Sequence, residues 1–86
     1  MQIIWTKHAE QRLTEWEQRK QITRAEIERL LLDPDQLVYG DLNILIAQSR
    51  RGDGLLRVAF IETHIGRKVL TLYWTSKVAK YWKEHK

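Results

Sequence analysis

The spacing of apolar residues changes once along this chain, at its only proline, Pro34. Before that proline they recur every three or four residues, so that Ala9, Leu13 and Trp16 share one face of a helix predicted over 7–20. After it, apolar and polar residues alternate, which is typical of strands. A chain that is helical first and alternating afterwards is predicted to fold as α+β, with helices packed on a sheet.

Both predicted helices have recognisable ends. Thr6 stands where an N-cap residue would lie before the first helix. Thr23 and Glu26 match the capping-box pattern at the start of the second helix. That helix is expected to end near Asp33, because the residue before a proline is pushed out of the α region. Its apolar positions are Ile27, Leu30 and Leu31.

Breaks that contain glycine divide the rest of the chain. Between them lie four predicted strands: Gln36 to Tyr39, Asn43 to Arg51, Leu55 to Thr63 and Lys68 to Thr75. Their tight loops favour consecutive antiparallel pairing, in a four-stranded sheet or in a five-stranded one if Ile3 to Trp5 adds an N-terminal strand. Ser76 is expected to cap a short final helix that runs to Lys83.

The length of 86 residues suits one domain, 1–86, with one core. The chain has no cysteine, so it forms no disulfide, and we expect a reducing, cytoplasmic location. Its longest uncharged apolar stretch, Leu42 to Ser49, is too short for a bilayer, and no signal-peptide pattern opens the sequence. His8, His64 and His85 lie far apart, so we expect no metal site and no cofactor.

Positive charge is concentrated in the second half of the chain. Residues 1–42 contain six Lys or Arg against eight Asp or Glu, whereas residues 43–86 contain nine against three. The net charge of +4 is mild, but its uneven distribution predicts a basic surface on the sheet and at the C-terminus. RNA is the anionic partner that we expect there.

His8 and Arg57 are the first two candidates for chemistry. A histidine exchanges protons near neutral pH, and Arg12 follows His8 by one helical turn. Composition alone favours the alternative, a helix-edge histidine that is merely solvated or hydrogen-bonded. Arg57 interrupts an apolar strand, where a charge is costly unless it is satisfied. It would clamp a phosphate, form a structural ion pair with Glu62 or with a helix carboxylate, or lie in water at a sheet edge.

Further basic and aromatic residues extend the candidate surface. Arg50 and Arg51 stand beside a glycine turn, where a solvated hairpin end is the alternative to a ligand-binding role. Lys77, Lys80 and Lys83 recur every three residues and would form a basic helical stripe, which helix-dipole and solubility effects also explain. Four aromatic residues would stack on bases or belong to the core: Tyr73, Trp74, Tyr81 and Trp82.

Several short motifs follow one another along nearly the whole chain. They are His8-Ala9-x-x-Arg12-Leu13, Ile22-Thr23-x-x-Glu26-Ile27, Asp33-Pro34, Leu56-Arg57-Val58, and Thr71-x-Tyr73-x-Thr75-Ser76-Lys77 followed by Tyr81-Trp82. Together they resemble the bacterial family called domain of unknown function 4258, which is similar to the RelE/ParE/BrnT toxin-like group of folds. The resemblance implies two N-terminal helices packed on an antiparallel sheet.

The resemblance also implies an activity. Many members of the wider group cleave RNA without metal by activating a ribose 2′-hydroxyl, whereas others inhibit gyrase or have no known activity. Carried over by motif, the implied catalytic residues are His8, Arg57, Lys77 and Tyr81, with Arg12 in the same motif as His8. Together with the basic residues named above, this gives the predicted RNA-binding residues Arg12, Arg50, Arg51, Lys80 and Lys83. The implied partners are RNA or the ribosome and a small acidic antitoxin. A non-catalytic module that binds RNA or protein is the alternative.

Overall fold

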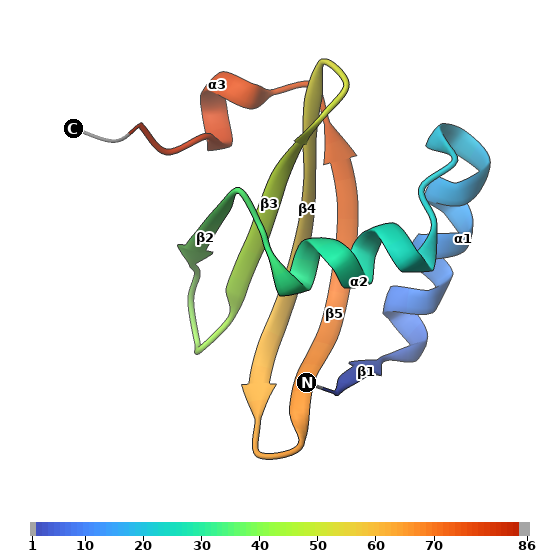
Figure 1. Ribbon diagram of the computed structural model, residues 1–86, viewed down its shortest axis with the longest axis vertical. Helices are drawn as coiled ribbons and strands as arrows, with labels where there is room; N and C mark the ends of the chain where they lie inside the picture. Colours follow the sequence, from blue (N-terminus) through green and yellow to red (C-terminus); the bar gives the residue numbers. More distant parts are fainter. Residues whose placement is uncertain (1, 85–86) are drawn as a thin grey trace.

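The computed structural model of the protein describes residues 2–84 (Figure 1). The elements follow in the order β1 (Ile3–Trp5), α1 (Lys7–Lys20), α2 (Arg24–Leu32), β2 (Gln36–Tyr39), β3 (Leu45–Arg51), β4 (Gly54–Thr63), β5 (Gly66–Thr75) and α3 (Val78–Tyr81). The expected α+β class, with two N-terminal helices, a sheet and a short C-terminal helix, is confirmed.

The predicted helix starts are confirmed by their caps. The Thr6 side chain accepts a hydrogen bond from the backbone nitrogen of Ala9 at 3.1 Å and donates one to the carbonyl of Val69 at 2.7 Å. Thr23 accepts from the backbone nitrogen of Glu26 at 3.2 Å. Both caps satisfy backbone N–H groups that a helix start leaves without a partner. The Thr6 cap also ties the start of α1 to β5.

The sheet has five strands in the order β1-β5-β4-β3-β2. Strands β2 to β5 pair consecutively and antiparallel, as predicted. The expectation that the whole sheet is antiparallel was wrong at one edge, because β1 pairs parallel to β5. Two helices separate β1 from β2 and carry the chain from one edge of the sheet to the other, so β1 is free of the antiparallel geometry that tight hairpins impose.

Helices α1 and α2 cover one face of the sheet. In Figure 1, α2 crosses in front of the central strands and α1 lies on the side of β5. Along β4, Leu56, Val58 and Phe60 point into this layer and are at most 1% exposed. The core also contains Ala9, Leu13, Trp16, Ile22, Ile27, Leu30, Leu31, Ala47, Val69 and Leu72. The predicted apolar faces of both helices are therefore buried here.

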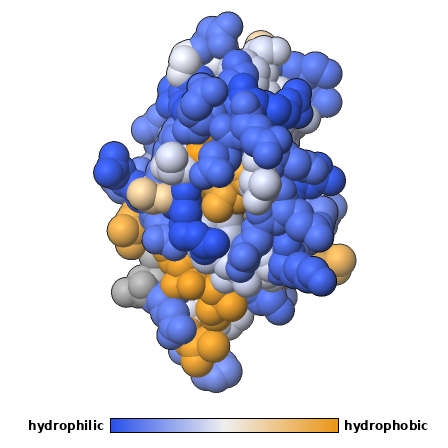
Figure 2. Space-filling view, turned by 90° about the vertical axis from the view of Figure 1, so that its right-hand side faces the viewer, coloured by the Kyte–Doolittle hydropathy of each residue, from blue (hydrophilic) through white to orange (hydrophobic). Residues whose placement is uncertain are grey.

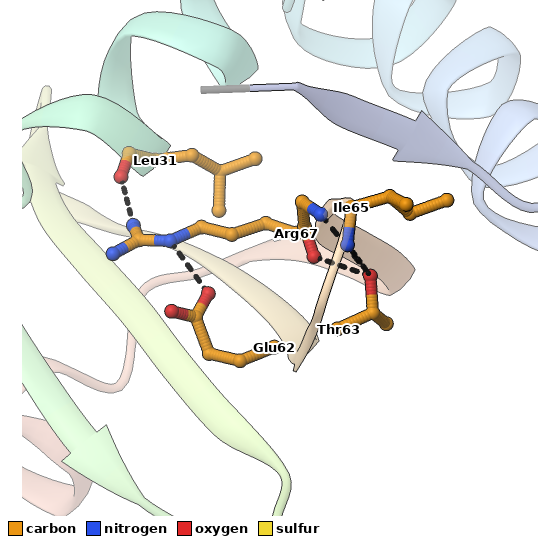
Figure 3. A network of polar contacts seen from close by, with 6 residues as sticks. Leu31, Glu62, Thr63, Ile65 and Arg67 are labelled. Atoms are coloured by element: carbon orange, nitrogen blue, oxygen red, sulfur yellow. Dashed lines mark hydrogen bonds and ion pairs between the residues drawn. The ribbon is translucent and has the colours of Figure 1, made fainter.

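Arg67 fastens α2 to the sheet (Figure 3). Its guanidinium donates to the carbonyl oxygen of Leu31 in the last turn of α2, and to the carboxylate of Glu62 at 2.8 Å. Thr63 closes the adjoining hairpin by accepting from the backbone nitrogens of Ile65 and Gly66. Arg67 is a structural arginine, because a helix carbonyl and a carboxylate both satisfy it.

The second face of the sheet carries the alternate side chains of the strands. Along β4 these belong to Leu55, Arg57, Ala59 and Ile61, and we call this side the Arg57 face. Neither α1 nor α2 covers it. Only the C-terminal segment, residues 76–84, lies over one end of it, where the backbone carbonyl of Tyr81 accepts a hydrogen bond from Gln48 of β3.

The final helix is shorter than expected. Ser76 is not its cap: Lys77 occupies the N-cap position without a side-chain hydrogen bond, and the helix ends at Tyr81. Lys83 lies beyond it, since its backbone is bonded to Gln36 instead of continuing the helix. The predicted stripe of three lysines on one helix was therefore wrong.

Seen from the side of α1 and β1, most of the surface is polar, and apolar residues gather toward the end that holds β1 and the β4–β5 hairpin (Figure 2). Ile65, in that hairpin, is 55% exposed. Within residues 2–84, no helix has the length and apolar character that crossing a bilayer requires.

Candidate functional site

A row of four polar side chains crosses the Arg57 face. Strand register places Gln36 of β2 opposite Gln48 of β3, Gln48 opposite Arg57 of β4, and Arg57 opposite Tyr73 of β5. Gln48 is fully buried, and Gln36 and Arg57 are 8% and 7% exposed. Polar groups at such depth cost free energy unless they are hydrogen-bonded. We call these four residues the polar row.

Hydrogen bonds run along the polar row from end to end. The Nε2 of Gln48 donates to Oε1 of Gln36 at 2.8 Å. Arg57 donates from Nε to Oε1 of Gln48 at 2.9 Å and from Nη1 to the hydroxyl of Tyr73 at 2.5 Å. Among the described residues, no buried side-chain nitrogen or oxygen lacks a partner. The row is thus a connected network.

The C-terminal segment docks on this row. Gln36 donates from Nε2 to the carbonyl of Lys83 at 2.5 Å and accepts from its backbone nitrogen at 3.0 Å, as a neighbouring strand would. Gln48 donates to the carbonyl of Tyr81 at 3.0 Å. These bonds hold the Tyr81 ring over Arg57, with the guanidinium carbon 4.0 Å from the ring centroid.

Arg57 has no acidic partner within the described residues. The ion pairs there join Arg12 to Glu15, Arg24 to Glu10, Arg51 to Glu26 and Arg67 to Glu62. The predicted alternative, an ion pair between Arg57 and Glu62, was therefore wrong. Arg57 instead contacts an amide oxygen, a phenol oxygen and an aromatic ring, all of them uncharged. Its positive charge is almost buried and not neutralised.

The strand positions around Arg57 on this face carry no acidic side chain. Along β2 to β5, every strand position that shares the Arg57 face by register is apolar, neutral polar or basic. The basic positions of this face are Arg50, opposite Leu55, and Lys68, which lies further along the sheet opposite Ile61; Arg50 stacks on Trp82 at 4.7 Å. These strand positions carry cations and no carboxylate, so they attract anions; the C-terminal segment adds one exposed carboxylate, Glu84, beside its lysines.

Two tyrosines beside Arg57 have opposite pKa shifts. Burial raises the pKa of the Tyr73 phenol, against the lowering influence of Arg57. The neighbouring Tyr73 hydroxyl, followed by Lys80, lowers the pKa of the Tyr81 phenol. The two rings meet edge to face, with centroids 6.4 Å apart. Tyr81 therefore loses its proton more readily than Tyr73 does, which is the property expected of a base in such a pair.

The lysines predicted as ligands lie at the edge of this site. Lys77 and Lys80 are exposed at the start and in the last turn of α3, and Lys83 is exposed beyond it. The ammonium of Lys80 lies 5.1 Å from the centroid of the Tyr81 ring. The structure thus brings Arg57, Tyr81 and Lys80 together, with Lys77 one helical turn before Tyr81.

His8 and Arg12 do not join this site. Both are exposed on α1, whose buried side packs on the face of the sheet that is opposite to Arg57. Arg12 pairs with Glu15 at 2.6 Å. Arg51 is likewise engaged elsewhere, because it donates to Glu26 of α2 at 2.7 Å. The sequence placed these residues with Arg57, whereas the structure separates them.

A hollow of about 170 Å³ lies between α2 and the end of β3, away from Arg57. Its lining contains acidic and basic residues, and the Arg51–Glu26 ion pair is part of it. Such mixed charge indicates no particular class of ligand. Residues 2–84 contain no cluster of three His, Asp or Glu side chains. His85 lies outside the described residues.

Sequence reasoning missed Gln36 and Gln48. In an alternating strand a glutamine is normally read as a solvent-facing residue. Its importance here depends on register, which sets Gln36, Gln48 and Arg57 side by side. The one available signal was that Gln48 directly follows the apolar run 44–47, where a strand is expected to be buried.

No family model, curated protein or solved structure matched this chain in comparison. The resemblance drawn from the motifs accordingly stays a prediction.

Proposed function

We propose that the Arg57 face binds single-stranded RNA, with Arg57 as the phosphate-binding residue. The observation that carries this proposal is the almost buried guanidinium, whose partners are all uncharged. Keeping such a charge without a carboxylate destabilises a fold, so an anionic ligand is a reason for retaining it. Arginine suits this role because it stays protonated and its planar fork fits phosphate oxygens.

The surroundings favour an extended anion over a small one. Lys77, Lys80 and Lys83 border Arg57 on one side of the face, and Lys68 lies further along β5. Successive phosphates of a strand would meet successive cations in this arrangement. The half-exposed rings of Tyr81 and Trp82 offer surfaces on which bases stack.

Cleavage of the bound RNA without metal is a second candidate, favoured by the lowered pKa of Tyr81. Its phenolate would take the proton of a ribose 2′-hydroxyl, and the freed oxygen would attack the adjacent phosphorus. The bond to the 5′-oxygen then breaks, water protonates that oxygen, and a cyclic phosphate remains. Arg57 would stabilise the negative charge that develops on the phosphate. His8 has no part in this scheme, because it lies on the other side of the sheet.

The test is the affinity for a fluorescent single-stranded RNA at several salt concentrations. We expect Arg57→Gln to weaken binding about tenfold or more, since a hydrogen bond to a charged group is lost. Arg12→Gln removes the same charge from exposed α1 and serves as the matched control. Equal affinities of the two variants would refute the role of Arg57.

The same samples separate binding from cleavage. RNA ends are mapped after incubation with chelator, and cleavage predicts products that depend on Tyr81, with Tyr81→Phe as the variant. If the RNA is bound tightly but stays intact, the protein binds RNA without cleaving it, and the cleavage proposal is refuted. An acidic protein that displaces RNA from the wild type, but does not bind Arg57→Gln, would be the partner that the protein-interaction alternative predicts.

A further inference from the structure

Gln48 joins the two parts of the proposed site. Its Oε1 accepts from Nε of Arg57 at 2.9 Å, while its Nε2 donates to the backbone carbonyl of Tyr81 at 3.0 Å. One buried side chain therefore contacts the guanidinium and the backbone that carries the ring above it. No other residue in the described part of the chain hydrogen-bonds to both.

The orientation of the Gln48 amide is set by its neighbours. Gln36 must present its Nε2 to the carbonyl of Lys83 and its Oε1 to the nitrogen of Lys83. The same Oε1 accepts from Gln48, so Gln48 must turn its Nε2 toward Gln36. Its oxygen is then left to face Arg57. The C-terminal backbone thus fixes which atom the guanidinium meets.

The Gln48 amide differs from a glutamate at the same position mainly in charge. A glutamate at position 48 would have almost the same size and would accept from Arg57 as well, but it would neutralise the guanidinium. Its carboxylate would also lose the donors that Gln36 and Tyr81 now receive. Arg67, with Glu62 as its partner, shows the neutralised arrangement in the same protein.

We propose that Gln48 is a positioning residue: its neutral amide orients Arg57 and leaves the guanidinium charge available to an anionic ligand. This inference rests on the proposed function, and it adds a reason for the type of residue at position 48. The amide satisfies the Nε–H of Arg57 without competing with phosphate for its charge.

The test replaces Gln48 by Glu and measures RNA affinity and unfolding free energy together. We expect affinity to fall about tenfold, as if the charged contact were lost, and the salt dependence to weaken by about 0.7 in log–log slope. The fold should keep its stability, because the new ion pair offsets the lost donors. Gln18→Glu makes the same charge change on exposed α1 and should leave RNA binding within twofold.

A second variant tests whether weaker RNA binding comes only from a less stable fold. Gln48→Met is neutral and of similar length, so it should weaken RNA binding less than Gln48→Glu does, while destabilising the fold more. The proposal is overturned if Gln48→Glu binds RNA as the wild type does, if it fails to fold, or if affinity follows stability in both variants.

A titration with inorganic phosphate distinguishes a failure of this inference from a failure of the proposed function. The probe is the NMR signal of the Arg57 Nε–H during phosphate titration. If the wild type binds no RNA, but phosphate shifts that signal in the wild type and not in Gln48→Glu, the RNA function is wrong and the role of Gln48 stands. Shifts of equal size in both proteins would refute the proposed role of Gln48.

Discussion

Replacing the buried Arg57 and the partly buried Arg67 of the sheet by methionine, one at a time, should have opposite effects on stability and on RNA binding. Arg57 and Arg67 both lie in β-strands, and both have side chains largely withdrawn from water. They differ in partners: Arg67 has a carboxylate and a helix carbonyl, whereas Arg57 has uncharged groups alone within the described residues. Methionine retains much of the aliphatic length and removes the charge.

At position 57 the two main contributions nearly cancel. Loss of the bonds to Gln48 and Tyr73 costs about 1.5–3 kcal/mol each, because the donor is charged. Removing a buried charge that no carboxylate neutralises returns several kcal/mol of desolvation free energy. We therefore expect the free energy of unfolding of Arg57→Met to lie within about 1.5 kcal/mol of the wild-type value.

At position 67 nothing offsets the loss. Glu62 is 57% exposed on its side chain, so the ion pair itself contributes at most about 1 kcal/mol. The bond to the carbonyl of Leu31 adds about 1.5–3 kcal/mol, and its loss leaves the end of α2 without that donor. The free energy of unfolding of Arg67→Met should be lower than that of the wild type by about 2–3 kcal/mol, which corresponds to a Tm lower by roughly 10–20 °C for a domain of this size.

Urea unfolding followed by tryptophan fluorescence measures both variants, and RNA affinity is measured on the same preparations. Arg57→Met should keep its stability and lose binding, while Arg67→Met should lose stability and keep binding in the folded fraction. If Arg57→Met were the less stable of the two by more than about 2 kcal/mol, Arg57 would be a structural residue and the argument for an anion site would fail.

Three further predictions concern the surroundings of the site. Gln36→Leu removes both hydrogen bonds to the backbone of Lys83, so the amide of Lys83 should exchange with solvent at least about tenfold faster, as NMR would show; unchanged exchange would mean that another contact holds the segment. Tyr73→Phe removes the main cause of the lowered pKa of Tyr81, which should rise toward the usual phenol value in an ultraviolet titration, whereas a constant pKa would assign the shift to Lys80. Gly54→Ala would place a Cβ 2.2 Å from the carbonyl of Thr75 and 2.5 Å from the ring of Trp74, so a loss of about 2 kcal/mol or more is expected on calorimetry, and a neutral result would show that the hairpin end can shift.

Local signals were sufficient for most of the fold. The caps at Thr6 and Thr23 and the proline after Asp33 set the helix bounds, because each acts within a few residues of its own position. Glycine breaks placed the strands to within two residues. The β1–β5 pairing was not predictable in the same way, since a parallel contact between distant segments leaves no local pattern.

The site was predictable only in part, for a related reason. Arg57 stood out because a charge in an apolar strand is unusual, and alternation assigned its face correctly. His8 was grouped with it through a family resemblance, which carries no information about which side of the sheet α1 covers. Gln36 and Gln48 depend on strand register, and Lys83 depends on the backbone bonds that end α3 early.

The parallel pairing of β1 has a consequence for how the chain acquires its fold during synthesis. Thr6 caps α1 and donates to Val69, which follows it by 63 residues. The first strand and both long helices are therefore made well before the strand that completes their packing. Contacts of such long range are slow to form, so the acidic, helical half should remain incompletely packed until β5 has emerged from the ribosome. Translation that stops before β5 would then give a chain without a stable core.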